Sequence, residues 1–347
     1  MAVYTTIDNP EDYIIAHNYS GNDSTNNQTS LGMTPDLVWV KSRNTGSPTQ
    51  HYIVDKVRGD EEYIISNSTA AEATDSNTFA LVSGGFNLDG GNGWTNLSGR
   101  TYVAWNWKAG GAGSSNTDGT ITSTVSADTT AGFSIVKWTG TASAGTIGHG
   151  LGVAPKVVLV KRYSTAGGGW LMQHGDLTGA TYVIKLNTTG AEGDDGANFN
   201  STFPTSSVFS VYDSNNTNAS GADHIAYCFA EKQGYSKFGS YTGNGNADGA
   251  FVYTGFRPAF VMTKGSDVVD NWWMFDNKRE GYNDDNAALY PNLQNAEAAP
   301  GWIDLLSNGF KMRNDDVAGN GDGSTYIYMA FAHSPFVNSE GVPTNAR

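Results

Sequence analysis

The chain has 347 residues, of which 20 are Lys or Arg and 34 are Asp or Glu, so its formal net charge is −14. This acidic balance argues against a nucleic-acid-binding surface, which needs clustered basic residues, and against contact with anionic membranes. A single cysteine, Cys228, excludes an intrachain disulfide. The 43 glycines supply tight turns and the 12% aromatic residues suit half-buried strands, so the composition indicates an all-β protein.

Residues 1–13 are expected to form an N-terminal arm used in assembly. Asp8, Glu11 and Asp12 interrupt this stretch, so it shows no apolar signal-peptide core. No apolar run in the chain reaches the roughly 18 residues of a membrane span. We therefore expect a soluble protein without a signal peptide and without membrane insertion, made in a cytoplasm.

From residue 14 onward, a proline followed by an apolar run and then a lysine occurs three times. The three stretches are GMTPDLVWVKS (32–42), GLGVAPKVVLVKR (150–162) and GFRPAFVMTKG (255–265). Each nearly continuous apolar run predicts a central strand covered on both faces. The proline cannot donate to the ladder and belongs at the strand entry, whereas we expect the lysine to return the chain to water.

Four further landmarks recur in the same order, which predicts a tandem duplication with a period of about 100–120 residues. They are 51–59, 170–179 and 272–281; 63–67, 182–187 and 288–292; 84–88, 207–211 and 308–312; and 99–107, 221–230 and 323–332. The last landmark alternates, with Val103, Trp105 and Trp107 on one face of the expected strand, as in a β-sandwich.

The predicted fold is therefore all-β, with three tandem β-sandwich repeats of jelly-roll or lectin-like type and Gly/Asn-rich loops. The expected boundaries are the arm at 1–13, repeat 1 at 14–110, a Gly/Ser/Thr-rich linker at 111–131, repeat 2 at 132–238, repeat 3 at 239–337, and a C-terminal tail at 338–347. Each repeat is long enough to hold a core of its own.

No catalytic, cofactor-binding or metal-binding set emerges from the sequence. The six histidines do not fall in a metal-ligating pattern, and Cys228 in AYCFA is expected to be a buried apolar residue. The histidines are His17, His51, His149, His174, His224 and His333. No nucleophile elbow, phosphate loop or dinucleotide fingerprint is present.

An Asp-x-x-Arg pattern occurs as Asp55/Arg58 and as Asp276/Arg279, whereas the second copy has His174 at this place. A structural interpretation, in which the carboxylate forms a salt bridge or accepts backbone N–H bonds, is preferred to a ligand-binding pair, because a repeated feature usually serves the repeated fold.

Trp170, Trp272 and Trp273 favour core or subunit packing, with stacking on a sugar ring as the alternative. The Asx-rich loops at 88–94, 192–198, 282–286 and 314–324 carry oxygen ligands of the kind that Ca²⁺ takes, but they lack EF-hand spacing. Solvated turns are the preferred interpretation of these loops, and calcium binding is left open.

Several stretches resemble structural proteins of tailed phages that are common in marine phages. They include MAVYTTIDNPEDYI, YIVDKVRG, NSTAAEATDSNT, TYVAWNWKAGGAGSSNTDGTITSTVSADTTAGFSIVKWTG, AYCFAEKQGYSKFGSYTGNG, LSNGFKMR and YIYMAFAHSPFV, besides two of the proline stretches. The resemblance covers nearly the whole chain and implies a virion component, such as a tail fibre, a tail tip or capsid-surface material. No catalytic motif defines the group, so function must be argued separately from fold.

The sequence thus predicts a non-enzymatic virion structural protein without cofactors. Its expected partners are other tail or capsid proteins and further copies of the chain, with a trimer as the guess and a pseudo-threefold monomer as the alternative. A glycan of the host surface is a candidate partner. The alternative functions are a carbohydrate-binding module array and a glycan-degrading enzyme, which would need paired carboxylates in a groove.

Overall fold

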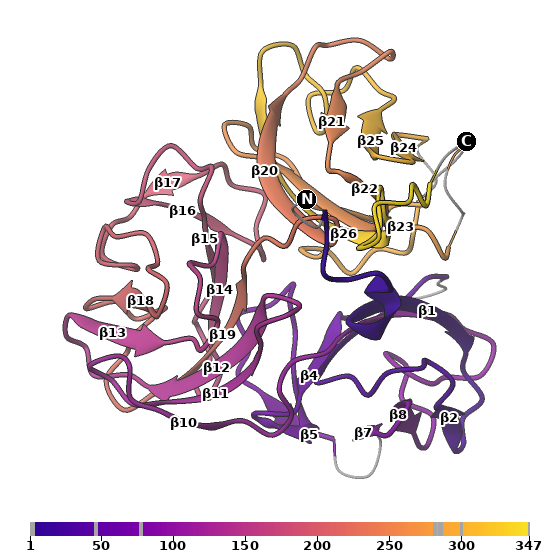
Figure 1. Cartoon of the computed structure of the whole chain (residues 1–347). Helices are drawn as coiled ribbons and strands as arrows, with labels where there is room; N and C mark the ends of the chain where they lie inside the picture. The colour runs from indigo at the N-terminus through magenta and orange to yellow at the C-terminus, as the bar shows by residue number, and fades with distance from the viewer. Residues whose placement is uncertain are drawn as a thin grey trace.

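The computed structural model describes residues 4–44, 48–75, 79–279, 283, 287–298 and 301–345, and these are built almost wholly of β-strands (Figure 1). The helical content of this part is the short 3-10 turn η1 (Pro10–Asp12). The expected all-β class is confirmed. The strands lie in three groups around a common centre, and each group has a larger and a smaller sheet.

The first group begins at residue 14 and ends at residue 107. Its larger sheet has the strand order β1-β9-β3-β4-β5-β6, and its smaller sheet has the order β2-β8-β7. The strands are β1 (Ile14–Ser20), β2 (Asn26–Gln28), β3 (Leu37–Ser42), β4 (Tyr52–Asp55), β5 (Gly59–Ile64), β6 (Ala73–Thr74), β7 (Phe79–Val82), β8 (Gly85–Leu88) and β9 (Thr101–Trp107).

The second group runs from residue 114 to residue 229. Its larger sheet has the order β10-β11-β12-β19-β14-β15-β16-β17, and β13 pairs with β18 in the smaller sheet. The strands are β10 (Ser114–Asn116), β11 (Ser123–Asp128), β12 (Phe133–Thr139), β13 (Gly145–Gly148), β14 (Val157–Arg162), β15 (Trp170–His174), β16 (Tyr182–Lys185), β17 (Gly193–Asp194), β18 (Val208–Val211) and β19 (Asp223–Phe229).

The third group runs from residue 236 to residue 335. Its larger sheet has the order β20-β26-β22-β23, and its smaller sheet has the order β21-β25-β24. The strands are β20 (Ser236–Thr242), β21 (Phe251–Tyr253), β22 (Phe256–Gly265), β23 (Trp273–Asp276), β24 (Ile303–Leu306), β25 (Gly309–Met312) and β26 (Thr325–Pro335).

The three larger sheets share one core order of strands. The proline–lysine strands β3, β14 and β22 each lie between the last strand of their group and the strand that follows them. They are buried along nearly their whole length, as their apolar sequences predicted. Pro258 lies inside β22 at a shift of register against β26, a position where a missing backbone donor is tolerated.

Both faces of each larger sheet are buried, because successive side chains of a strand point to opposite faces. In β9, Tyr102 and Ala104 pack toward the smaller sheet with Phe86, as expected from the alternation. Trp105 and Trp107 point the other way, into a central cluster that all three groups share. The molecule therefore has one core between the sheets of each group and a further core at the centre.

A buried asparagine holds the entry loop of each group. Asn96, Asn218 and Asn320 are fully buried. Their Nδ2 atoms donate to loop carbonyls of Ser24 (2.7 Å), Ser143 (2.7 Å) and Asn246 (2.8 Å). A Cβ on Gly21, Gly140 or Gly243 would overlap the backbone that carries or adjoins these asparagines. This close approach explains why the stretches YSGND, KWTGT and SYTGN share a glycine.

Three segments outside the expected repeats also pack against the sheets or against one another. The 111–131 segment, expected as a linker, contributes β10 and β11, and β11 pairs with β12. The arm crosses to the third group, where the Tyr4 hydroxyl donates to the Gly255 carbonyl (2.8 Å). Ile7 is buried in the central cluster. The tail meets the arm, since the Ser339 amide donates to the Asp8 carboxylate (2.7 Å).

Candidate functional site

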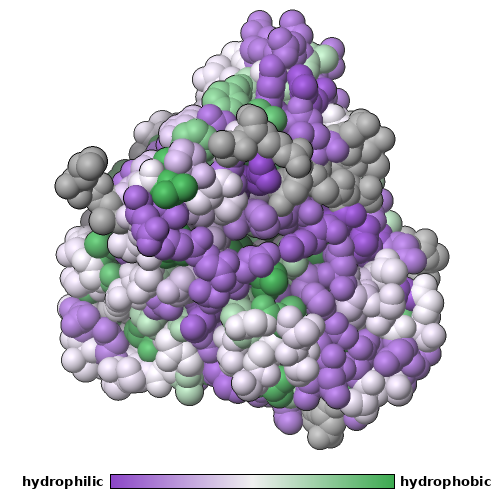
Figure 2. Space-filling model, turned by 45° about the vertical axis from the view of Figure 1, so that its right-hand side comes forward, coloured by the Kyte–Doolittle hydropathy of each residue, from purple (hydrophilic) through white to green (hydrophobic). Residues whose placement is uncertain are grey.

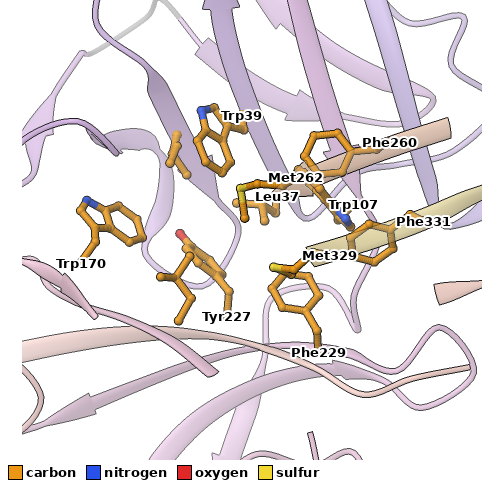
Figure 3. Close-up of a pocket in the computed structure, with 12 residues that line it drawn as sticks. Leu37, Trp39, Trp107, Trp170, Tyr227, Phe229, Phe260, Met262, Met329 and Phe331 are labelled. Carbon is orange, nitrogen blue, oxygen red and sulfur yellow. The ribbon is translucent and has the colours of Figure 1, made fainter. Parts of the chain in front are cut away.

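The centre of the molecule is an apolar junction of the three larger sheets. Figure 3 shows side chains from all three groups pointing toward one another around a cavity of about 30 Å³. Each group supplies large apolar residues to this lining, among them Leu37 and Trp39, Tyr227 and Phe229, and Met262 and Met329. The cavity has about the volume that one water molecule takes up in the liquid, and its lining is apolar, so it suits packing and not catalysis.

Hydrogen bonds between equivalent positions connect the three groups in a closed cycle. In each group, one ring nitrogen bonds a backbone carbonyl of the neighbouring group. The ring belongs to His51 just before β4, to Trp170 at the start of β15, and to Trp272 just before β23. The bonds are Trp170 Nε1 to Ile65 O (2.8 Å), Trp272 Nε1 to Lys185 O (3.0 Å) and His51 Nε2 to Tyr290 O (2.8 Å). The first joins group 2 to group 1, the second group 3 to group 2, and the third group 1 to group 3.

A landmark asparagine fixes the start of each of these strands. It accepts the backbone N–H of the residue whose ring makes the bond between groups. The pairs are His51 with Asn67 (3.2 Å), Trp170 with Asn187 (2.9 Å) and Trp272 with Asn292 (3.1 Å). The carbonyl that each ring reaches lies two residues before such an asparagine, in a different group. The landmark ending in Asn thus supplies both sides of the contact.

A second set of equivalent bonds lies five residues after each of these asparagines. Here a glutamate N–H donates to the carbonyl two residues after the buried lysine of the neighbouring group. The bonds are Glu72 N to Tyr163 O (2.8 Å), Glu192 N to Ser266 O (2.7 Å) and Glu297 N to Arg43 O (2.9 Å). Return bonds run from Gly167 N to Thr69 O, from Asp270 N to Thr189 O and from Thr49 N to Gln294 O. Together these bonds form three contacts, one between each two neighbouring groups, and we call these contacts the seams.

The Asp-x-x-Arg pairs lie in two of the seams. We call the side chain at this position, which bonds the neighbouring group, the corner of the seam. Arg58 Nε donates to Asp55 (2.6 Å) with both side chains fully buried, and Asp55 also accepts the Arg58 amide (2.9 Å). The same carboxylate accepts the Tyr227 hydroxyl of the second group (2.8 Å). The expected salt bridge with backbone acceptance is confirmed. Its added role is to connect two groups.

The corner in the third group repeats this arrangement. Arg279 Nε donates to Asp276 (2.7 Å), and Asp276 accepts Trp105 Nε1 of the first group (3.0 Å). The Arg279 guanidinium also lies 5.9 Å from the centre of a Trp105 ring. Trp105 and Tyr227 occupy equivalent places, because each is paired with the third residue of its proline–lysine strand in the register.

The second group has a neutral corner. His174 Nε2 lies 3.3 Å from the Tyr328 carbonyl of the third group, and its Nδ1 accepts the Asp176 amide (3.1 Å). Burial lowers the pKa of His174 to about 4. The imidazole is therefore neutral at pH 7 and accepts at Nδ1 while Nε2–H donates across the seam.

The three landmark lysines are fully buried, so the expectation that they return the chain to water is wrong. Lys41 Nζ donates to Thr49 O (2.6 Å) and to Gln294 O of the third group (3.0 Å). Lys161 Nζ donates to Gly168 O (2.6 Å) and Lys264 Nζ to Val268 O (2.9 Å). Backbone carbonyls replace water around each amine, which is why these strands can end in the interior.

Burial also sets the ionisation of these lysines. It lowers the pKa of Lys41 to about 7 and the pKa values of Lys161 and Lys264 to about 8. Each amine contacts neutral oxygen acceptors that belong to the loops of the seams, in two cases across a seam. The lysines therefore hold the chain together and are not arranged around a cleft where a substrate could reach them.

The other residues singled out in the sequence are also structural. Trp170 and Trp272 are 0% and 1% exposed at the seams, and Trp273 is 6% exposed with its ring 3.8 Å from that of Trp302. The expected core packing is confirmed, so none of the three presents a face to a sugar. Burial raises the pKa of the Cys228 thiol to about 12, which fits its expected role as an apolar residue.

The remaining histidines and the Asx-rich loops do not gather into a metal site. Within the described ranges, no group of three His, Cys, Asp or Glu side chains could hold a metal ion. Asn314 and Asp316 accept backbone amides of their own loop, Asp316 N and Ala318 N, as expected of turns. The loop at 282–286 lies, except for residue 283, outside the described residues.

The surface of the described residues has several hollows that the sequence did not indicate, and one of them is a groove lined by exposed aromatic residues. It lies between β20 and β21, has a volume of about 430 Å³ and also includes Lys156, Asp176 and Glu231. Phe251 and Tyr253 on β21 are 48% and 49% exposed. The face drawn in Figure 2 is largely hydrophilic, with scattered apolar residues. Alternation of Phe251 and Tyr253 around buried Val252 was the available signal for this groove.

Comparison with known proteins places the chain in a family. A family model described as "Domain of unknown function (DUF7483)" matches residues 9–335, which is nearly the whole chain. The chain belongs to this family. No curated protein and no solved structure matches it. The matched residues include all three strand groups, but the family description names no activity.

None of the helices found among the described residues is long and apolar enough to cross a membrane.

Proposed function

We propose that this chain is a non-enzymatic structural protein of a tailed-phage virion, placed in a tail fibre, a tail tip or the capsid surface. In this proposal its three strand groups are tandem β-sandwich repeats. They close into a pseudo-threefold ring within one chain. The family assignment is compatible with this function but does not supply it.

The observation that carries the proposal is the cyclic set of seam bonds. The side chains that could do chemistry at the centre are the buried Asp–Arg pairs, the buried lysines and the seam histidines. Each one bonds a strand or a loop of a neighbouring group or of its own group. Such a use of charged groups stabilises a fixed architecture, since a buried pair that loses one partner leaves an uncompensated charge.

The cycle also bears on the oligomeric state. Heterologous contacts between identical subunits close into a ring when the rotation returns to its start. Here the third seam returns to the first group through Glu297 and Arg43, whose side chains also form a salt bridge (2.9 Å). The faces that the three groups bury against one another are thus covered within one chain, and a trimer would have to use other faces. This favours the pseudo-threefold monomer over the trimer.

The two alternative functions have different support. A carbohydrate-binding array that uses the seam tryptophans is disfavoured by their burial, although Phe251 and Tyr253 leave a single glycan site open. A glycan-degrading enzyme needs two carboxylates that share a groove. Asp176 and Glu231 do share the β20–β21 groove, but Asp176 is paired with Lys156 and Glu231 accepts the Phe238 amide. The buried carboxylates Asp55 and Asp276 are bonded to Arg58 and Arg279 in separate corners.

The test is the location of the protein. Phage particles that encode this chain are purified by density gradient, and their proteins are identified and counted by mass spectrometry. We expect the chain in intact particles at a fixed copy number, released together with tail or capsid proteins. Recovery only in the unassembled lysate, together with release of reducing ends from host polysaccharide, would contradict the proposal and support the enzymatic alternative.

A further inference from the structure

The three groups differ at one edge of the larger sheet. This edge faces the gap between β1 and β2 in the first group, between β12 and β13 in the second, and between β20 and β21 in the third. In the second group the chain fills this gap itself. β11 pairs with β12, for example Val125 opposite Val136. Ile121 bridges to Ile147 of β13, and Ser123 Oγ donates to the Gly148 carbonyl (3.0 Å). One extended segment thus closes the edge by touching both sheets.

In the third group the same edge is open. β12 and β20 are equivalent, because Phe133 pairs with Phe229 and Ser236 pairs with Phe331 at matching points of β19 and β26. By this register, β20 residues 236–240 correspond to the β12 residues 133–137 that β11 covers. Residues 237–241 instead line the groove of about 430 Å³, with β21 on its other side. The groove therefore occupies the place that β11 takes in the second group.

The backbone of β20 is prepared for a further strand. The Phe238 N–H points away from β26 and donates to the Glu231 carboxylate (2.8 Å), which stands where the carbonyl of an added strand would accept. Backbone direction alternates along a strand, so the Ser240 N–H faces the same way. Ser240 lies opposite Ile327 of β26, but this alternation turns its N–H away from β26, and no loop or side-chain acceptor for it is found among the described residues. An unpaired edge of this kind is a template for another chain.

The side chains of the groove indicate what kind of segment fits. Its charges balance, since Lys156 pairs with Asp176, and the lining also holds one further cation, Lys237, and one further carboxylate, Glu231. Phe251 and Tyr253 add exposed aromatic surface, and the Lys237 amine lies 5.6 Å from the Tyr253 ring centre. A net-neutral groove inside a strongly acidic protein complements an uncharged segment. The segment that fills the equivalent edge has such a stretch, Ile121–Ala127, made of Ile, Thr, Ser, Val and Ala.

The first group shows that the edge is not always available. There His17 Nε2 and Gln28 Oε1 are 2.7 Å apart and join β1 to β2 across the corresponding gap. The three edges are therefore closed by a side-chain bond, closed by the chain's own strand, and open. Only the open one combines an unpaired amide with exposed aromatic residues, among the residues that the structure describes.

We propose that the β20–β21 groove binds an extended, uncharged, Ser/Thr/Val-rich segment of a partner protein, which adds as a strand to β20. This deepens the proposed function, because it names the contact through which a virion subunit would hold this chain. The bond is main-chain pairing in the manner of β-augmentation, and the aromatic residues supply the side-chain contacts.

The test uses the full-length protein and a synthetic peptide with the sequence of residues 119–127, GTITSTVSA, carrying a fluorophore. We expect saturable binding by anisotropy and slower amide exchange in residues 236–242. Ser240→Pro removes the outward amide at an edge position that tolerates proline, and it should weaken binding about tenfold or more. Tyr253→Ala should weaken binding as well.

Matched controls separate this site from other effects. Phe203→Ala removes an aromatic side chain of similar exposure, 40%, outside the groove and should leave binding unchanged. A peptide with proline at the positions of Thr124 and Val125 should not bind. Circular dichroism and thermal unfolding check that each variant is folded.

Three results would overturn the proposal. The peptide does not bind; or it binds equally to the Ser240→Pro protein and protects residues 133–139, which indicates strand exchange in the second group; or a neutral oligosaccharide binds and Tyr253→Ala abolishes that binding while the peptide has no effect, which makes the groove a sugar site. Failure here leaves the particle location untouched, so the two proposals fail separately.

Discussion

The corners of the three seams are at equivalent positions but are of two kinds, two charged and one neutral. In the seams formed by Asp55 and Asp276, a carboxylate is held by a buried arginine and accepts a side-chain donor of the neighbouring group. In the seam formed by His174, a neutral imidazole faces a backbone carbonyl at 3.3 Å. The charged corners are strong while both partners are present, whereas the neutral corner depends on the protonation state of one ring. Equivalent geometry thus need not mean equivalent strength.

The largest effect is expected from breaking a charged corner. Asp276→Ala removes the closer carboxylate partner of the buried Arg279, leaving Glu297 at 3.4 Å, and removes the acceptor of Trp105 Nε1, so unfolding should require about 3–5 kcal/mol less free energy. Asp55→Ala should cost a similar amount. Urea denaturation followed by tryptophan fluorescence measures both. The exposed Asp322→Ala is the control and should change the free energy by less than about 0.5 kcal/mol. A loss below 1 kcal/mol in both corner variants, on the scale of an exposed ion pair, would contradict their role.

Acid should weaken the neutral corner next. The pKa of His174 falls from 6.5 to about 4 in the folded chain, and that of His224 does the same, in both cases first because of burial. The unfolded chain binds protons below pH 6.5 that the folded chain refuses. The stability due to the neutral ring is thus complete above pH 6.5 and is lost as the pH falls to about 4, up to about 3 kcal/mol for each ring.

His174→Gln separates the two histidines. Glutamine keeps a donor and an acceptor but does not titrate, so it should remove the His174 share of the acid-induced loss and leave the share of the other histidines whose pKa values are lowered, which are His51, His149, His224 and His333. His224 is buried in the second group beside Trp138 and serves as the comparison. Unfolding free energies at pH 4.5, 5.5 and 7 supply the measurement. If His174→Gln leaves the pH profile unchanged, the seam corner does not titrate as described.

Replacing a seam tryptophan sharpens the equivalence of the seams. Trp170→Phe and Trp272→Phe each remove the ring donor to a backbone carbonyl of the neighbouring group, of Ile65 or Lys185, and open a small void. Each should cost about 2 kcal/mol, and the two costs should agree within about 1 kcal/mol. Thermal and chemical unfolding give the comparison. A large loss of unfolding free energy at one position and none at the other would show that one seam does not contribute to stability.

The smallest effect is expected in the groove. Phe251→Ala removes an aromatic ring that is half exposed, so the free energy of unfolding should change by less than about 0.5 kcal/mol. Such a result would set the groove apart from the core, as residues kept on the surface without a role in stability. A loss of 2 kcal/mol or more would instead place Phe251 in the packing of the third group.

Much of the local structure follows from the sequence, because strand patterns are local. The apolar runs before Lys41 and Lys161 and the alternation in 99–107 give central strands with the correct faces. The Asp-x-x-Arg turns were also interpreted correctly. The exposure of the landmark lysines was not, because an amine at a strand end is buried or solvated according to what packs against it. Gln294 O, which reaches Lys41, is remote in sequence.

The closed cycle could not be predicted for the same reason. Its bonds join residues such as Glu297 and Arg43 that share no local pattern. A partial signal did exist, since the landmark asparagines Asn67, Asn187 and Asn292 are each followed five residues later by a glutamate. The groove was missed because its significance depends on β11, whose place on β12 is visible only in the sheet pairing.

Amide hydrogen exchange at Glu72, Glu192 and Glu297 tests the central claim most directly, because these three loop amides donate across the three seams. If one chain closes the ring, all three amides exchange slowly and to a similar degree in a protein that light scattering shows to be a monomer of 36.9 kDa. Exchange at any one of them as fast as in an unprotected loop would mean that the ring is open at that seam, and the account would be wrong.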